Sequence, residues 1–134
     1  MNREIKFRAW DKKEKYMGFV LGAYFTENGW VDIETGKEET DTEDRARLKD
    51  VELMQYTGFK DKNEKEIYEG DILKSKHGTT NGYSFQHVLW GENDGAFYVE
   101  FNSSWYSLVC LLHSGMGHTV EVIGNIYENP KLLK

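Results

Sequence analysis

Apolar and polar residues alternate along much of the chain with a period of two, which is typical of strands that bury one face. The alternation recurs in short segments separated by Gly- and Asn-rich turns, such as 51–56 (VELMQY), 71–76 (DILKSK), 83–90 (YSFQHVLW) and 96–101 (AFYVEF). This pattern predicts a mainly β fold, either a small barrel or a sandwich of short antiparallel strands, with one or two short helices.

Two local signals support the strand prediction. Asn28 and Gly29 suit a type I′ hairpin turn, in which both central residues have positive φ. The segment IKFRAW near the N-terminus divides into an apolar face and a face with two bases and a tryptophan. Its first face comprises Ile5, Phe7 and Ala9, and its second comprises Lys6, Arg8 and Trp10.

Two segments depart from the alternation. We interpret residues 36–50 as a variable acidic insertion, because 38–44 carries five acids and no base. Thr42 can cap a short helix running through 45–48, and a solvated loop is the equal alternative. The apolar run in 105–113 (WYSLVCLLH) fits a buried strand or a helix segment.

Length and composition indicate one soluble domain spanning residues 1–134. The single cysteine, Cys110, excludes an intrachain disulfide and gives no reason to expect an oxidising compartment. The N-terminal residues 1–15 are charged and lack the apolar region of a secretory signal. The longest apolar runs are shorter than the roughly 18 residues of a membrane span, so we expect a cytoplasmic protein without membrane contact.

The net charge of −6 disfavours nucleic acid as a partner, because phosphate neutralisation supplies most non-specific affinity. Residues 3–15 are locally basic, with six bases and three acids. Nucleic-acid binding therefore stays an alternative hypothesis. It would use Lys6, Arg8 and Trp10 together with Lys74, Lys76 and His77.

Signatures of catalysis are absent from the sequence. It contains no GxxxxGK[ST] loop, no GxSxG elbow and no GxGxxG turn. Cys110 and His113 have the spacing of two metal ligands, but no further pair completes a zinc site, and Cys110 in SLVCLL is expected to be buried. We predict no enzymatic activity, no catalytic residue, no metal and no cofactor. A small hydrolase using Cys110 with His113 or His118 is the less favoured alternative.

The stretch 56–73 (YTGFKDKNEKEIYEGDIL) combines a charged loop with a frame of aromatic residues. A Gly-Asp pair before an apolar strand is common in SH3-like barrels, which bind peptides or nucleic acid through loop aromatics. Under the competing interpretation the aromatics fill the core, Gly70 makes a bend, and Asp71 bonds the turn backbone.

Three blocks of the sequence together resemble the YopX family of phage and prophage proteins. They are IKFRAWD at the start, LMQYTGFKDKNEKEIYEGDIL in the middle and VEVIGNIYENP near the end. The resemblance implies a cytoplasmic, predominantly β protein encoded by phage or prophage DNA, for which oligomers are plausible. It implies no catalytic residues.

From these observations we predict a non-enzymatic phage or prophage accessory protein that self-associates and binds a macromolecule. The expected partners are a second copy of the chain and an unknown host or phage protein. The candidate binding residues are Tyr56, Phe59, Lys60, Lys62, Tyr68, Lys6, Arg8 and Trp10.

Overall fold

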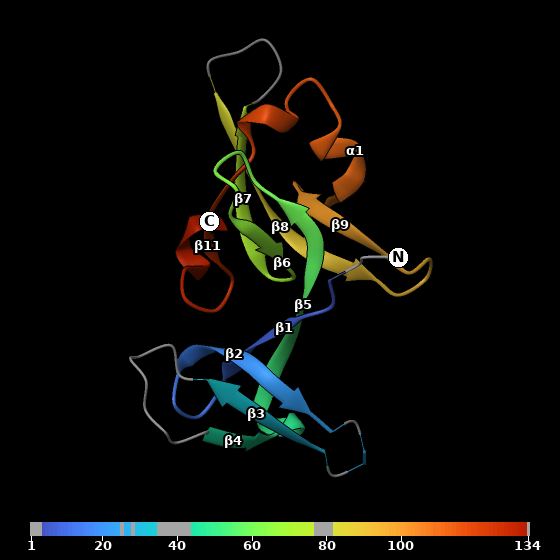
Figure 1. The fold of residues 1–134 in the computed structure, drawn as a ribbon. Coiled ribbons are helices and arrows are strands. Elements are labelled where there is room, and N and C mark those ends of the chain that lie inside the picture. The colour runs from blue at the N-terminus through green and yellow to red at the C-terminus, as the bar shows by residue number, and fades with distance from the viewer. Residues whose placement is uncertain (1–3, 25, 28, 35–43, 77–81, 134) are drawn as a thin grey trace. The chain divides into compact units, whose positions relative to one another are not determined.

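The computed structural model describes residues 4–24, 26–27, 29–34, 44–76 and 82–133 (Figure 1). Within these ranges the chain is mainly β, with antiparallel strand pairs and short helices, and the predicted fold class is confirmed. Among the described strands, the order of neither sheet closes on itself, so these strands form no closed barrel. The chain divides into two compact units, Met1–Tyr56 (unit 1) and Thr57–Lys134 (unit 2). The expectation of a single domain stays a prediction.

Unit 1 is an antiparallel sheet with the strand order β4-β3-β2-β1-β5. Its apolar cluster comprises the buried side chains of Ala9, Val31, Ile33 and Val51, supplied by alternate strand positions. The elements are β1 (Phe7–Asp11), β2 (Tyr16–Ala23), β3 (Trp30–Glu34), β4 (Asp44–Arg47), the 3₁₀ turn η1 (Leu48–Asp50) and the first part of β5 (Val51–Lys60).

The charged loop between β1 and β2 is organised by one carboxylate. Asp11 Oδ1 accepts hydrogen bonds from the backbone N–H groups of Lys13 (2.9 Å) and Glu14 (2.8 Å). Lys15 then adopts a φ of 58°, the left-handed conformation that reverses the chain. A local Asp-based turn therefore explains the sequence DKKEK without any need for a binding role.

Of the two equal alternatives for residues 45–48, neither the helix nor the solvated loop is correct. Asp44–Arg47 forms β4 and pairs with β3, with Ala46 opposite Val31 and Arg47 opposite Trp30. The guanidinium of Arg47 lies 5.0 Å from the centre of the Trp30 ring. Pairing with a strand that already packs on the core satisfies backbone groups that an isolated short helix would leave open. Thr42 and Asn28, and with them the predicted cap and I′ turn, lie outside the described residues.

Unit 2 contains a five-stranded antiparallel sheet with the order β10-β9-β8-β7-β11, and β6 pairs with β5. Its core includes Ile67, Leu73, Val88, Val99 and Val120, all nearly or fully buried. The elements are the end of β5, β6 (Glu66–Tyr68), β7 (Asp71–Lys76), β8 (Tyr83–Gly91), β9 (Ala96–Phe101), β10 (Ser104–Ser107), α1 (Leu108–Leu112), η2 (Gly117–Thr119), β11 (Glu121–Asn125) and η3 (Pro130–Leu133).

The ambiguous run 105–113 changes from strand to helix at Ser107 (Figure 1). The Ser107 side chain accepts a hydrogen bond from Cys110 N and so caps α1. Helical spacing turns Leu108 into the core and leaves Cys110 exposed. The expectation of a buried Cys110 is therefore wrong, because the run is not a strand with one apolar face.

Candidate binding surface

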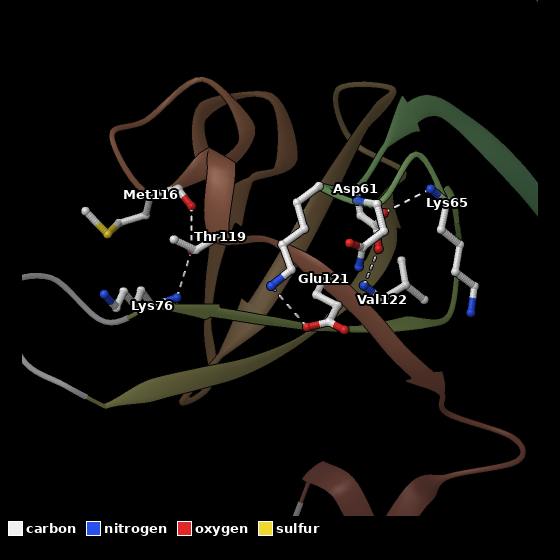
Figure 2. Close-up of polar contacts among 9 residues, drawn as sticks. Asp61, Lys65, Lys76, Met116, Thr119, Glu121 and Val122 are labelled. Atoms are coloured by element: carbon white, nitrogen blue, oxygen red, sulfur yellow. Dashed lines mark hydrogen bonds and ion pairs between the residues drawn. The ribbon is translucent and has the colours of Figure 1, made fainter.

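The charged loop of the 56–73 stretch is anchored by the carboxylate of Asp61, which is 6% exposed. Its Oδ1 accepts hydrogen bonds from the backbone N–H groups of Asn63 (2.8 Å) and Lys65 (2.9 Å). Its Oδ2 accepts one from Val122 N at 2.8 Å, and Figure 2 shows Asp61 between the loop and β11. Lys62 N adds a bond to Val120 O at 3.0 Å. The loop is thus held by its own backbone donors and by the start of β11.

The Gly-Asp pair at the start of β7 is also architectural. Gly70 has a φ of 81°, a conformation that favours glycine. Asp71 is buried and its Oδ2 accepts a hydrogen bond from Tyr68 N at 2.8 Å. These observations confirm the expectation that Gly70 bends the chain and Asp71 bonds the turn backbone.

The aromatic residues of this stretch are mostly interior. Tyr56 is 5% exposed and Tyr68 is 4% exposed, and Phe59 is half-buried against the core of unit 2. They contribute to packing rather than to an exposed rim. The two loop lysines chosen from the sequence, Lys60 and Lys62, are both exposed. Lys62 forms an ion pair with Glu121 at 3.4 Å, and Lys60 forms no ion pair among the described residues.

The basic strand chosen from the sequence lies in unit 1, where Lys6, Arg8 and Trp10 are half-buried. Lys6 Nζ lies 2.9 Å from a carboxylate oxygen of Glu4 and 4.9 Å from the centre of the Tyr56 ring. Its charge is therefore already engaged within the unit. The eight chosen residues fall into two groups, Lys6, Arg8, Trp10 and Tyr56 in unit 1 and Phe59, Lys60, Lys62 and Tyr68 in unit 2.

The outward face of β8 in unit 2 displays an aromatic surface that the sequence analysis missed. Tyr83 is 52% and Phe85 is 40% exposed, whereas the polar residues Ser84 and Gln86 between and beside them are buried. Gln86 Nε2 donates a hydrogen bond to Ser75 Oγ at 2.8 Å, whereas Gln86 Oε1 is buried and accepts no hydrogen bond among the described residues. The period-two alternation of YSFQHVLW predicts a strand. The usual rule places the apolar residues of such a strand on the buried face, and here the polar Ser84 and Gln86 lie on that face instead.

A shallow groove of about 520 Å³ runs beside these aromatics, and we call it the aromatic groove. His87 and Glu100 lie opposite each other on β8 and β9, with Nε2 and Oε2 3.4 Å apart. Leu132 and Leu133 of η3 are exposed large apolar side chains that also line the groove. The residues that define the groove here are Tyr83, Phe85, His87, Glu100, Leu132 and Leu133.

Two lysines of β7, the strand between β8 and β11, lie beside the exposed aromatic residues of β8. On β7, Lys74 lies opposite Phe85 and Lys76 lies opposite Tyr83. Lys74 Nζ is 4.2 Å from the centre of the Tyr83 ring, a cation–π contact. Lys76 N donates to Thr119 Oγ1 at 2.9 Å, as Figure 2 shows, so this end of β7 is fixed by η2. His77, grouped with these lysines in the sequence analysis, lies outside the described residues.

Cys110 and His113 of the hydrolase alternative lie in α1 and at its C-terminal cap. Cys110 is exposed, and the ring Nδ1 of His113 lies 2.9 Å from Val109 O. The His113 ring packs edge-on against Phe59, with 6.4 Å between centroids. Within the described part of the chain, no group of three or more His, Cys, Asp or Glu side chains is placed to hold a metal ion.

Among the described residues, no helix combines the length and the apolar character that crossing a bilayer requires.

The fold and its surface define a mainly β protein of two compact units, one of which carries an exposed aromatic sheet face. The chain belongs to the YopX protein family, whose sequence model matches residues 6–134. The predicted family assignment is thereby confirmed. None of the curated proteins matches the chain.

Two crystal structures are similar over nearly the full chain. Protein EF1440 from Enterococcus faecalis is 30% identical, with a TM-score of 0.67 and coverage of 98% of this chain and 99% of that one. Protein yopX from Bacillus subtilis is 21% identical, with a TM-score of 0.60 and coverage of 96% and 98%. The second likeness shows the shared fold.

Proposed function

We propose that this chain is a non-catalytic binding module whose partner is a protein, and that the aromatic groove is the surface that receives it. The observation that carries the proposal is the exposure of Tyr83 and Phe85 beside Leu132 and Leu133. Aromatic residues are enriched in the buried centres of protein interfaces, and contiguous exposed apolar patches mark interaction sites. Membership of the YopX family supports an accessory role in the bacterial cytoplasm, encoded by phage or prophage DNA.

The first partner we propose is a second copy of the same chain, and a host or phage protein is the further one. Sedimentation velocity over a concentration series tests self-association directly. Replacing Tyr83 and Phe85 together by Ser removes the two exposed rings, and we expect the dissociation constant to rise by about tenfold or more. The exposed Tyr24 of unit 1 provides the control, and Tyr24→Ser is expected to leave association unchanged.

A concentration-independent monomer would contradict self-association. The same double variant then tests a heterologous partner, since a protein that binds the wild type through the groove must lose affinity for the variant. Equal binding of both forms would contradict the assignment of the groove.

A second candidate function, single-stranded nucleic-acid binding, is favoured by the position of Lys74 and Lys76 beside Tyr83 and Phe85. Stacking platforms combine aromatic faces with cations that follow the phosphate backbone. Fluorescence anisotropy with labelled oligonucleotides at low salt is the test. Loss of binding in Lys74→Ala but not in Lys6→Ala would place the contact on unit 2, and no binding at low salt would exclude the candidate.

A further inference from the structure

A second hollow in unit 2 lies at the turn between β8 and β9 and combines aromatic rings with carboxylates. Its volume is about 450 Å³. Trp90 comes from β8, Tyr98 from β9 and Trp105 from β10, while the acidic residues belong to the turn itself. We call it the turn pocket and define it by Trp90, Glu92, Asp94, Tyr98 and Trp105.

The aromatic walls of the turn pocket are held in place by their neighbours. The Tyr98 and Trp105 rings lie 5.9 Å apart between centroids at an angle of 42°. A Cβ atom added at Gly91 would lie 2.6 Å from the Tyr98 ring, so this ring rests directly on the glycine backbone. Trp90 packs edge-on against Phe97 at 4.8 Å. Trp105 is nonetheless 53% exposed, which leaves ring surface open to a ligand.

The polar groups of the Tyr98 and Trp105 rings both form hydrogen bonds to carboxylates. The Tyr98 hydroxyl donates to Asp94 Oδ2, and Trp105 Nε1 donates to Glu100 Oε1 at 3.3 Å. Both donors are thereby used, and what remains available on each ring is the electron-rich face. Such faces attract cations.

The electrostatic environment of the turn pocket is negative. Its described lining includes Glu92 and Asp94 and no lysine or arginine. In the part of the chain that the structure describes, neither carboxylate forms an ion pair. The pKa of the Tyr98 phenol is raised above its ordinary value of 10.0, first by the hydrogen bond to Asp94, then by burial, and then by the charge of Asp94.

We propose that the turn pocket binds an organic cation, an alkylammonium or quaternary ammonium group, over the exposed ring surface of the adjoining Trp105 and Tyr98 side chains and beside Asp94 and Glu92. Aromatic faces with adjacent carboxylates are the chemistry that recognises such groups. An anion would be repelled, and a neutral apolar ligand would leave both carboxylates without a counter-charge. An inorganic cation prefers a fuller set of oxygen ligands than two carboxylates and exposed rings supply.

The same chemistry has two sources, a free amine or an ammonium side chain on a partner polypeptide. The experiment titrates the protein with choline as the probe. Tryptophan fluorescence and the indole N–H signals in ¹H–¹⁵N spectra report the binding. The control ligand is 3,3-dimethyl-1-butanol, the neutral isostere of choline, which has the same shape without the charge. Saturable binding of choline and no binding of the isostere is the expected result.

Variants locate the contact. We expect Trp105→Ala to raise the dissociation constant by about tenfold, within the range of cation–π contacts, and Asp94→Asn to raise it several-fold. Tyr106 provides the matched control, because it neighbours Trp105 on β10, is 54% exposed and does not line the turn pocket. Tyr106→Ala is expected to bind choline like the wild type. Circular dichroism establishes that each variant is folded, and Asp94→Asn tests the pocket even where Trp105→Ala disturbs it.

Equal binding of choline and its isostere, or an unchanged affinity in both pocket variants, would overturn the proposal, as would the absence of any saturable choline binding. A lysine-containing peptide that binds at least about tenfold more tightly than choline would assign the ammonium group to a polypeptide partner. Comparable affinity would assign it to a free amine. The aromatic groove is tested by Tyr83→Ser with Phe85→Ser, so failure of either site is recognised separately.

Discussion

Asp61 and Val122 lie 61 positions apart in the chain, yet Asp61 Oδ2 accepts a hydrogen bond from Val122 N at 2.8 Å. The same carboxylate holds two N–H groups of its own loop, so one buried side chain joins the 56–73 stretch to β11. Two blocks that mark the family resemblance are thus joined physically. Because both partners belong to unit 2, the contact stabilises that unit.

Replacing Asp61 by Ala should destabilise unit 2 strongly, because three backbone donors lose a charged acceptor in a buried place. We expect the free energy of unfolding to fall by about 2–4 kcal/mol. Urea denaturation followed by tryptophan fluorescence measures the change.

The adjacent Lys62 provides the control for this substitution. Its ion pair with Glu121 is solvent-exposed, so Lys62→Ala should cost under about 1 kcal/mol. Similar losses for both variants would show that Asp61 contributes as a surface charge and not as an anchor.

Tyr98 should titrate above pH 10.0, its ordinary value, because its hydrogen bond to Asp94 stabilises the protonated phenol. The folded state then holds this proton more tightly than the unfolded state does. The resulting stabilisation is complete below pH 10 and is lost as the pH rises through the folded pKa. Spectra of ¹³C-labelled tyrosine against pH measure the titration.

Substitutions assign the Tyr98 signal among the eight tyrosines of the chain. Tyr98→Phe removes the signal and flattens the corresponding part of the alkaline stability profile. Asp94→Asn should lower the pKa of Tyr98 towards 10.0. A tyrosine signal that does not move in Asp94→Asn would contradict the contact.

Gly91→Ala should disturb the turn pocket from beneath. The new methyl group would lie 2.6 Å from the Tyr98 ring and 2.9 Å from Asp94 Oδ1, so the ring must move. We expect a loss of about 1–3 kcal/mol in the free energy of unfolding, together with weaker choline binding. Thermal denaturation measures the first effect.

Gly115 supplies the matched substitution, since an added Cβ there meets no atom within 4 Å. Gly115→Ala should leave both the stability and the choline affinity close to those of the wild type. If the two alanine variants behave alike, steric contact at Gly91 is not the cause.

Cys110 should react with a thiol reagent such as DTNB in the folded protein, because α1 exposes it. We expect a rate within about tenfold of that of the urea-unfolded chain, since access is not restricted. Cys110→Ser removes the reaction and should change the free energy of unfolding by less than about 0.5 kcal/mol. Protection of the thiol until global unfolding would show that α1 is packed differently.

The sequence predicted the features that depend on interactions between residues close together in the chain, namely strands and turns. The period-two segments became strands, and Gly70 with Asp71 formed the expected turn, because a positive φ and a carboxylate near backbone donors act within a few residues. The family blocks, too, could be recognised from the residues alone.

The direction in which a strand faces could not be predicted in the same way. On β8 the polar Ser84 and Gln86 are buried together with Val88, whereas Tyr83 and Phe85 are exposed, against the usual hydrophobic pattern at the start of the strand. Ser75 on β7 accepts the hydrogen bond of the buried Gln86 Nε2. The aromatic groove therefore depends on a partner strand, which the alternation within one strand does not reveal.

The sequence by itself determined that this is a mainly β protein of the YopX family, through alternation, turn residues and family blocks. Only the tertiary structure decided which side chains are available at the surface. It buried Tyr56 and Tyr68, exposed Cys110, and gathered Trp90, Tyr98 and Trp105 around one turn. The physical reason is that the burial of a side chain depends on which elements pack against it, and these elements are often distant in the chain.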